Sequence, residues 1–499
     1  MGETFAEHAS SRYELAFRAR DALGQNFERD DVLWFDNAYS DAVPIENFTI
    51  RTAQNQSPRV RQIITRKAGK FTMKQETPEP EEFGAYIGLD WADRTHVISL
   101  RSADSNKVER YKLAHTPEAL AEWVSDLQRR FAGQRVAVAL EQARGAVVHA
   151  LMGYDFLVLY PVNPKTLAKY REAFSPSGAK DDPVDADLLL ELVTLHRNKL
   201  RAWLPDDELT RTITLLVEYR RQLVASQTRL SNRLTSLLKL YFPQALAWAG
   251  ELTTVQACDF LQHWPTLGQV QQVAPTKLRK FYIAHGCRKA DVIEQRLQEI
   301  KVAQPLTKDG AVITASVAMV QACISQLRPV MEAIAQMEKQ IAELFGQHAD
   351  HDLFSSFPGA GPVFAPRLLV AMGADRGRFA AASEVQQLSG IAPVIERSGN
   401  SCWVHRRWAC PKFMRQSFHE FAGQSIRWSA WARAFYDQQR NRGNGHHAAV
   451  RSLAYRWIRI IYRCWQMRVP YCEETYCRAL VRRQSPLARV LSAQMQNCG

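Results

Sequence analysis

The chain has 499 residues, of which 46% are hydrophobic and 23% charged. This composition predicts about two to four folded domains and excludes a disordered, collagen-like or wholly coiled-coil protein. The net charge is +13, and residues 391–499 hold 18 Lys and Arg against 5 Asp and Glu, so that this segment accounts for the whole excess.

A net charge concentrated at one end favours a polyanionic partner, most often nucleic acid, over a solvated basic tail. Aromatic residues are interleaved with the arginines of this segment, which a solvated tail would not require: Trp403, Trp408, Trp428, Trp431, Tyr455 and Trp457. No apolar run approaches the roughly 18 residues of a membrane span, and the N-terminus lacks a secretory signal. The nine cysteines form no CxxC pair, which favours reduced thiols and a cytoplasmic protein.

Residues 1–83 are polar and without sustained periodicity, and are interpreted as a poorly structured N-terminal extension. Met73 is a candidate for the true initiator, with the 72 preceding residues lying upstream of it. The alternative is a genuine but mobile N-terminal arm.

Residues 84–204 alternate between short apolar runs and helical patterns. Strands are expected at 86–90, 95–100, 108–113, 135–140 and 156–162, with helices at 116–131, 146–152, 165–172 and 183–196. The order of three strands followed by alternating helices and strands predicts a mixed α/β layer, and it is also the order of the ribonuclease-H-like fold.

Residues 205–348 are expected to form a helical coiled-coil connector. Leucines recur every seven residues from Leu209 to Leu237 in a helix over 206–241, and a second apolar stripe follows from Ile313 to Phe345, where Pro329 is expected to introduce a kink. The two stripes predict an antiparallel arm or a dimerising bundle, with an ordinary buried helix pair as the alternative. Residues 242–310 are interpreted as a small helical insert.

Residues 349–470 are expected to form a mostly helical domain, followed by a basic tail at 471–499. The domain opens with a glycine-containing turn, Phe357 to Pro362, before an apolar helix over 363–372. Backbone amides at such a turn can hold a phosphate, as in helix-hairpin-helix modules, so Gly359 and Gly361 are candidate nucleic-acid contacts. Further helices are expected at 411–421 and 448–466.

Four carboxylates stand where the predicted sheet would gather them. Asp90 ends the first strand, Glu141 follows a buried strand, and Asp182 and Asp185 are spaced i,i+3 at a helix start. Oxygen ligands in such a set suit a pair of Mg²⁺ ions. Each residue also has an ordinary alternative, since Asp90 and Asp182 could cap a turn or a helix and Glu141 could pair with Arg144.

Ser398 lies before Gly399 in a polar turn, near the candidate DNA-binding arginines Arg397, Arg406 and Arg407. Arginines neutralise phosphate charge beside a hydroxyl nucleophile, but a serine before glycine in a turn is common. No GxSxG elbow or P-loop is present. The spacings around Cys402, Cys410, Cys472 and Cys477, with His405, His446 and His447, match no usual zinc pattern.

Together these segments resemble the DEDD transposases of the insertion sequence 110 type, with which Piv-like DNA invertases are grouped. The similarity covers about Ala85 to Gln466, and the order and spacing of the motifs are more specific than any motif alone. The resemblance depends on residues 86–90, 140–141, 180–187, 357–361, 388–393 with 398–399, 411–415 and 454–457.

The resemblance implies a RuvC-like (ribonuclease-H-like) domain, a coiled-coil connector and a C-terminal transposase domain. It assigns Asp90, Glu141, Asp182 and Asp185 as the metal-binding carboxylates and Ser398 as the nucleophile that joins covalently to DNA. It also places Lys412, Arg415 and Arg456 in family helices, where they are expected to contact nucleic acid. Three features depart from the family pattern: a longer N-terminus, Asp181 in place of a small hydroxyl residue, which leaves the roles of Asp181 and Asp187 open, and the extensions at 242–310 and 470–499.

The expected function is Mg²⁺-dependent cleavage and rejoining of the ends of an insertion sequence and its target DNA, by a bacterial cytoplasmic homodimer or homotetramer without a membrane. The resemblance also introduces a structured noncoding guide RNA as a partner. Two alternatives remain: a RuvC-like structure-selective nuclease that uses water as nucleophile, and a decayed transposase that only binds DNA.

Overall fold

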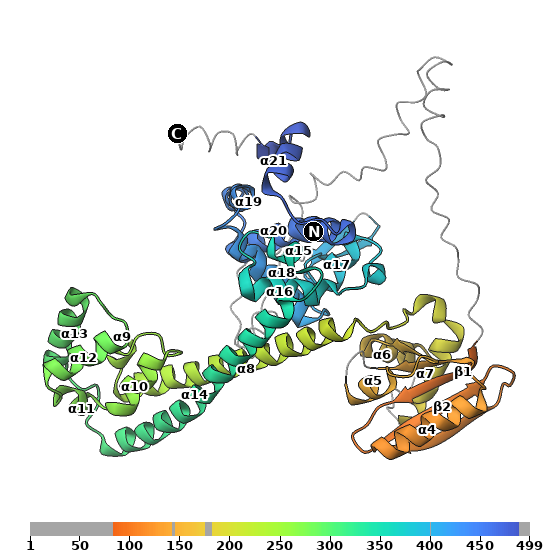
Figure 1. Ribbon diagram of the computed structural model, residues 1–499, viewed down its shortest axis with the longest axis horizontal. Helices are drawn as coiled ribbons and strands as arrows, with labels where there is room; N and C mark the ends of the chain where they lie inside the picture. Colours follow the sequence, from red (N-terminus) through yellow and green to blue (C-terminus); the bar gives the residue numbers. More distant parts are fainter. Residues whose placement is uncertain (1–82, 142–144, 175–181, 400, 489–499) are drawn as a thin grey trace, which may run out of the picture. The chain divides into compact units, whose positions relative to one another are not determined.

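The computed structural model describes residues 83–141, 145–174, 182–399 and 401–488. The chain divides into two compact units between Pro205 and Asp206, and each is described by itself (Figure 1). The predictions for the N-terminal extension, for Met73, Asp181 and Arg144 fall outside the described residues.

The first unit is built on one five-stranded sheet in the order β3-β2-β1-β4-β5. Strands β1, β4 and β5 are parallel, whereas β2 and β3 are antiparallel to their neighbours. The strands are β1 (Phe83–Asp90), β2 (Thr95–Ser102), β3 (Val108–Ala114), β4 (Arg135–Leu140) and β5 (Leu157–Pro161). This mixed order confirms the predicted ribonuclease-H-like layer.

Helices cover both faces of this sheet because its central strands are apolar on both sides. One face packs Ile87 and Val138 against Trp123 of α4 and Val148 of α5. The opposite face packs Ala137 and Ala139 against helices α6 and α7. The helices are α4 (Pro117–Arg130), α5 (Ala146–Leu151), α6 (Pro164–Phe174) and α7 (Asp182–Leu195), within about two residues of the expected bounds.

Gly88 sets the distance between β1 and α7. A Cβ atom at Gly88 would lie 2.0 Å from the carbonyl oxygen of Ala186 and 2.5 Å from the amide nitrogen of Leu190. Real Cβ atoms do not approach backbone so closely, so only glycine allows α7 to lie directly on the strand. The same close approach fixes the height of the first turns of α7 above the end of β1.

The second unit begins with two long helices, α8 (Glu208–Tyr241) and α14 (Gly310–Gly346), which lie side by side (Figure 1). Thr210 hydrogen-bonds His348 at 2.9 Å, and Arg220 donates from Nε to Glu338 at 2.9 Å, so the helices are antiparallel. Within one chain, the two helices therefore form an antiparallel pair, which agrees with the predicted antiparallel arm. Helix α14 continues through Pro329 as one helix.

The buried line of α8 differs from the predicted leucine heptad. The predicted leucines, Leu209 to Leu237, are only half-buried. The buried side chains are Thr210, Ile213, Val217, Leu234, Leu238 and Tyr241. No α8 side chain between Val217 and Leu234 is buried. The pair is therefore packed at its two ends against other helices, and the leucine spacing alone could not reveal those partners.

The insert consists of five short helices with their own core, as expected for residues 242–310. They are α9 (Ala245–Trp248), α10 (Val255–His263), α11 (Leu267–Gln271), α12 (Pro275–Ala284) and α13 (Ala290–Val302). Their core includes Phe260 and Tyr282 and is completed by Leu234 and Leu238 of α8 and Ile324 of α14.

Helix α14 passes the length and hydropathy test for a membrane span, which corrects the expectation that no apolar run approaches that length. Residues 310–327 contain no Asp, Glu, Lys or Arg. Its buried face, including Val320, Ile324 and Leu327, packs in the core of the insert. We therefore assign α14 to the folded arm.

The remainder of the second unit is mostly helical around a tryptophan-rich core. Its elements are α15 (His351–Ser355), α16 (Gly361–Met372), α17 (Ala382–Leu388), β6 (Val394–Ser398), β7 (Ser401–His405), α18 (Lys412–Ser425), α19 (Ala430–Asn441), α20 (His446–Met467) and α21 (Glu473–Arg482). Trp431 and Trp457 have no exposed surface, so these two serve the core and not a nucleic-acid surface as the interleaved pattern had indicated. Tyr471 and Leu480 also join this core, so the segment after residue 470 is partly packed.

Candidate active site

Asp90 and Glu141 lie beside each other at one edge of the sheet. Strands β1 and β4 are parallel neighbours, with Gly88 opposite Ala139 and Leu89 opposite Leu140. Side chains alternate along a strand, so Asp90 lies on the face of Gly88, and Glu141, directly after β4, follows the face of Ala139. Both positions therefore belong to the face that α7 covers, at the carboxyl ends of the strands.

Helix α7 brings the other two predicted carboxylates from the same face. Its first residue is Asp182, whose side chain lies outside the described residues. Asp185 is 1% exposed and forms an ion pair with Arg171 of α6, whose Nε donates to Oδ1 at 2.8 Å. The buried charge of Asp185 is thus balanced by the half-buried guanidinium of Arg171, a partner that the sequence pattern did not reveal.

Asp187 is held by the antiparallel part of the sheet. Ser99 donates from Oγ to Asp187 at 2.6 Å, and Arg110 donates from Nε at 2.9 Å. Since Ser99 stands opposite Gly88 in the ladder, these contacts join α7 to β2 and β3 where the helix lies closest to the sheet. Asp187 therefore joins α7 to β2 and β3, whereas Asp185 joins α7 to Arg171 of α6.

The donor set suits a hard divalent cation. It offers carboxylate oxygens from two adjoining strand ends and from the first turn of α7, which are the ligands that Mg²⁺ prefers. Among the side chains that the structure describes, no group of three or more His, Cys, Asp or Glu is close enough to hold a metal ion. Asp90, Glu141 and Asp185 therefore do not by themselves form a metal site in this structure, where the carboxylate of Asp185 is paired with Arg171, and the side chain of Asp182 lies outside the described residues.

Ser398 lies at the tip of a β-hairpin. Strands β6 and β7 are antiparallel, and Ser398 pairs with Ser401 across a two-residue connection in which Gly399 has a φ of 55°. Positive φ is what a tight hairpin requires, so the Ser-Gly sequence is explained first as turn chemistry. Both serines are exposed and, as a directly opposed pair, lie on one face of the hairpin. Ser401, a second hydroxyl beside Ser398, was not predicted from the sequence.

The predicted basic contacts differ in their surroundings. Arg397 pairs with Cys402, on the hairpin face opposite to Ser398. The guanidinium of Arg406 lies 4.6 Å from the ring centroid of Trp408, in a cation–π contact. Lys412 is exposed at the start of α18, and the Nη1 atom of Arg415 is buried without a hydrogen-bond partner among the described residues.

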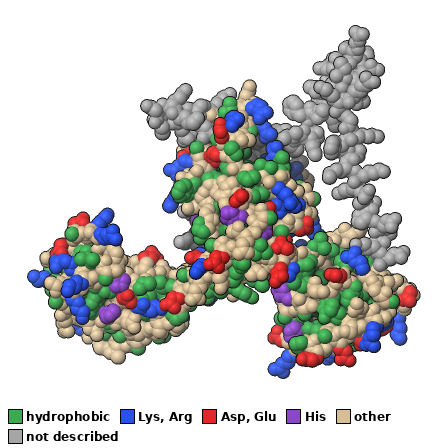
Figure 2. All heavy atoms as spheres, in the orientation of Figure 1, with side chains coloured by type: hydrophobic (Ala, Val, Ile, Leu, Met, Phe, Trp, Pro, Cys, Tyr) green, Lys and Arg blue, Asp and Glu red, His purple; other side chains and the backbone are tan. Residues whose placement is uncertain are grey.

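Arg456 has a structural contact of its own, because its guanidinium lies 4.3 Å from the ring centroid of Phe435. This contact joins α20 to α19. On the face shown in Figure 2, Lys and Arg side chains are dispersed among apolar and acidic ones. The basic excess of the C-terminal segment is therefore not gathered into one patch on that face.

The glycine turn before α16 is formed as expected, with φ values of 78° at Gly359 and 51° at Gly361. A Cβ at Gly359 would lie 2.6 Å from Cδ1 of Trp428, whereas a Cβ at Gly361 would meet nothing within 4 Å. The indole of Trp428 thus covers one side of the turn, and Gly361 is the more open of the two candidate contacts.

A histidine cluster between α18 and α20 was not found from the sequence. His419 lies beside His447, with ring centroids 5.8 Å apart. Burial lowers the pKa of His419 to about 4, with further lowering by the charge of Arg451. His419 is therefore neutral at physiological pH, and Arg406, which follows the hairpin, contributes to the same cationic surroundings.

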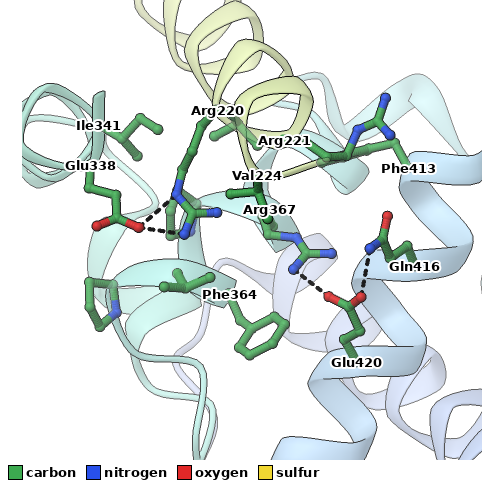
Figure 3. A pocket seen from close by; sticks show the side chains of 14 residues that line it. Arg220, Arg221, Val224, Glu338, Ile341, Phe364, Arg367, Phe413, Gln416 and Glu420 are labelled. Carbon is green, nitrogen blue, oxygen red and sulfur yellow. Dashed lines mark hydrogen bonds and ion pairs between the residues drawn. The ribbon is translucent and has the colours of Figure 1, made fainter. Parts of the chain in front are cut away.

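A cavity of about 260 Å³ lies between the two long helices and the C-terminal helices of the second unit. Its charged side chains are already paired, since Arg220 donates to Glu338 and Arg367 donates to Glu420 at 2.7 Å (Figure 3). The cavity holds none of the predicted site residues and is best described as a joint between α8, α14, α16 and α18.

The first unit therefore defines a ribonuclease-H-like class of phosphodiester-transfer enzyme, with paired carboxylates at the ends of adjoining parallel strands. Two family profiles match the chain. One, for DEDD transposases of the IS110 type, covers residues 87–243. The other, described as the transposase IS116/IS110/IS902 family, covers residues 351–437 and includes the hairpin with Ser398.

Full-length relatives agree with these profiles. The mini-circle putative transposase for IS117 of Streptomyces coelicolor is 28% identical over 396 residues, covering 78% of this chain and 95% of the relative. An IS110 43.6 kDa protein of the same species is 25% identical, covering 77% and 94%. An IS900 42 kDa protein of Mycobacterium paratuberculosis is 23% identical, covering 76% and 94%. The chain belongs to the IS110 family of DEDD transposases and is a DNA phosphodiester-transfer enzyme.

Proposed function

We propose that this transposase cleaves and rejoins DNA strands through a covalent phosphoserine intermediate formed by Ser398, with Mg²⁺ held by Asp90, Glu141, Asp182 and Asp185. The observation that carries the proposal is the adjacent placement of Asp90 and Glu141 on the sheet face covered by α7, within the segment that matches the DEDD profile. The exposed position of Ser398 at a hairpin tip supports its part in the reaction.

The carboxylates hold and position the ion. Asp90 and Glu141 are fixed by the register of β1 and β4, and Asp185 is positioned by Arg171. When bound, Mg²⁺ supplies orientation of the phosphate and neutralisation of the charge that develops on it. Divalent metal dependence follows from the DEDD class, and Mg²⁺ is the ion that this oxygen set favours.

Ser398 supplies the nucleophile. Its Oγ forms a bond to phosphorus as the bond from phosphorus to the 3′ oxygen breaks, and the serine proton is transferred away while the released 3′ oxygen gains one. The phosphate is then esterified to serine, so that its bond energy is retained. Attack by a 3′ hydroxyl on this phosphoserine reverses the step and rejoins a strand without ATP.

The partners follow from this chemistry. The substrates are the ends of the element and its target DNA, and a structured noncoding RNA is proposed as the guide. The helical pair α8–α14 is proposed as a coiled-coil arm of a homodimer or homotetramer. Helices α15 and α16, with the turn at Gly359 and Gly361, are proposed as a helix-hairpin-helix-like contact to the phosphate backbone.

A covalent trap tests the nucleophile. The purified chain is incubated with Mg²⁺, labelled junction DNA of its element and RNA from the flanking noncoding region, and products are separated on a denaturing gel. We expect a labelled protein–DNA adduct that Ser398→Ala abolishes and Ser401→Ala retains. Ser401→Ala is the matched control because it removes the directly opposed hydroxyl on the same hairpin face.

Other products distinguish the alternatives. An adduct lost only in Ser401→Ala would transfer the role to that serine. Cleavage without an adduct would favour a nuclease that uses water, and binding without either product would favour a DNA-binding protein without catalysis. For the metal role, Asp90→Asn should lower adduct formation by at least about 100-fold, since changes even in groups around a metal site cost 10–100-fold. Asp187→Asn, which alters a carboxylate tied to Ser99 and Arg110, should lower it by less than about tenfold.

A further inference from the structure

Trp403 is an exposed indole on the hairpin that carries Ser398. Its relative exposure is 61%, although tryptophan is a residue that folding normally buries. Its ring contacts His405, with centroids 4.8 Å apart, and His405 lies 3.6 Å from Glu396. The indole thus has a ring contact with His405 and keeps most of its surface in solvent.

The strand register places Trp403 on the same hairpin face as Ser398. Trp403 pairs with Glu396, and Ser398 pairs with Ser401. Directly opposed residues share a face, and so do residues two apart on one strand, so Ser398, Ser401, Glu396 and Trp403 all lie on one side. Trp403 is then the diagonal neighbour of Ser398, at about 7 Å by ordinary sheet geometry and within reach of a large side chain.

We infer that Trp403 is a stacking platform for an unpaired base beside the phosphate that Ser398 attacks. This inference rests on the proposed function of Ser398. A base is separated from its own phosphate by one sugar, so an indole diagonal to the nucleophile lies where that base would be. Within a duplex both faces of a base are covered by its neighbours, so stacking on Trp403 requires a nucleotide that is unstacked or single-stranded.

The net charge of the surrounding segment favours a nucleic acid as the occupant, although the hairpin face itself carries Glu396 opposite Trp403 and Arg397 lies on the other face. The segment containing the hairpin carries the entire net charge of the chain, and Arg406 and Arg407 directly follow β7. Exposed aromatic rings within a basic segment are the combination that binds single strands, where stacking contributes without regard to sequence. Trp403 is thus a positioning residue, and the bond-making step remains with Ser398.

Binding measurements in the Ser398→Ala background test this role without cleavage. The probes are fluorescent oligothymidylate and an abasic-spacer strand of equal length, followed by anisotropy over a range of salt concentrations. Trp403→Ala should weaken oligothymidylate binding at least about fivefold, the low end for loss of one stacked base. Binding of the abasic strand and the salt slope should not change, because an indole neutralises no phosphate.

Two further variants sharpen the result. Trp403→Phe should recover part of the affinity, and Tyr219→Ala, which removes a 47%-exposed ring from α8 of the same unit, should have no effect. Equal loss on the abasic and the thymidine strand, or no loss on either, would overturn the inference and favour a protein surface as the occupant. An oligouridylate arm shows whether an RNA base is held in the same way. The two proposals can fail separately. If the wild-type chain forms no covalent adduct but Trp403 still contributes to base-dependent binding, the role of Ser398 as nucleophile is refuted and the role of Trp403 in stacking is retained.

Discussion

At the scale of single residues, the acidic side chains of α7 differ in what balances their charge. Asp187 is partly exposed and accepts hydrogen bonds from Ser99 and Arg110. Asp185 is buried and is paired with Arg171. A buried carboxylate whose partner is removed is costly, because the protein interior cannot solvate it. The pair therefore offers a way to detect cation binding without measuring catalysis.

We predict that Arg171→Met lowers the free energy of unfolding by about 3 kcal/mol in the absence of divalent cations, because it leaves Asp185 buried and uncompensated. Adding Mg²⁺ should restore part of this loss, since a ligand that binds only the folded state stabilises it. Denaturant unfolding with and without Mg²⁺ measures both effects. The control is Arg171→Met with Asp185→Leu, which should regain stability and lose its response to Mg²⁺. An unchanged response in that double variant would separate Asp185 from the metal.

At the scale of elements, the position of the carboxylates depends on how closely helices and strands approach. Helix α7 reaches the sheet only because Gly88 has no side chain. Likewise, the α18–α20 contact brings His419 into cationic and apolar surroundings that neither helix has alone. Both contacts can be tested by changes in stability.

Gly88→Ala should destabilise the first unit by about 3 kcal/mol or more, because α7 must move away from β1 to relieve the clash with Ala186 and Leu190. Adduct formation should fall as well, since Asp182 and Asp185 move with the helix. The matched control is Gly153→Ala, where a Cβ meets nothing within 4 Å and the change should stay within about 1 kcal/mol. Thermal unfolding of both variants provides the measurement, and equal Tm values would contradict the close packing.

Stability should fall in mild acid because of His419. Its pKa is about 4 in the folded chain against 6.5 for an ordinary histidine, so the unfolded chain takes up the proton first as the pH falls. The free energy of unfolding should therefore decrease between pH 6.5 and about 4, by on the order of 2–3 kcal/mol. Urea unfolding across this range should show the slope for the wild type and a flatter one for His419→Gln. An identical slope in both proteins would show that other groups cause it.

At the scale of the whole molecule, charge is divided unevenly along the sequence. Residues 391–499 carry all of the net +13, and the remainder of the chain sums to zero. Affinity for duplex DNA should therefore decrease steeply with salt, through contacts made by the C-terminal part of the second unit.

Lys412→Ala combined with Arg415→Ala should reduce the slope of log affinity against log salt by about 2, one for each phosphate contact. Arg279→Ala is the control, because Arg279 is paired with Glu294 in the helical insert. Anisotropy titrations of a labelled duplex at several salt concentrations measure the slopes. An equal decrease with Arg279→Ala would place DNA on the insert as well.

The sequence by itself determined the order of strands and helices, the helical insert and the location of Asp90 and Glu141 at strand ends. These features depend on how apolar and polar residues alternate or recur over a few positions, and this pattern can be read from a short stretch of sequence. The family motifs depend on the order and spacing of residues and are equally visible in a single sequence.

Only the tertiary structure decided which side chains are buried in the core and which residues far apart in the chain contact each other. Trp431 and Trp457 are buried, whereas Trp403 is exposed, although all three stand among arginines in the sequence. Asp185 meets Arg171, and Trp403 shares a hairpin face with Ser398, because helix packing and strand register bring them together. Burial and cross-strand register depend on contacts between residues far apart in the chain, and local pattern does not contain that information.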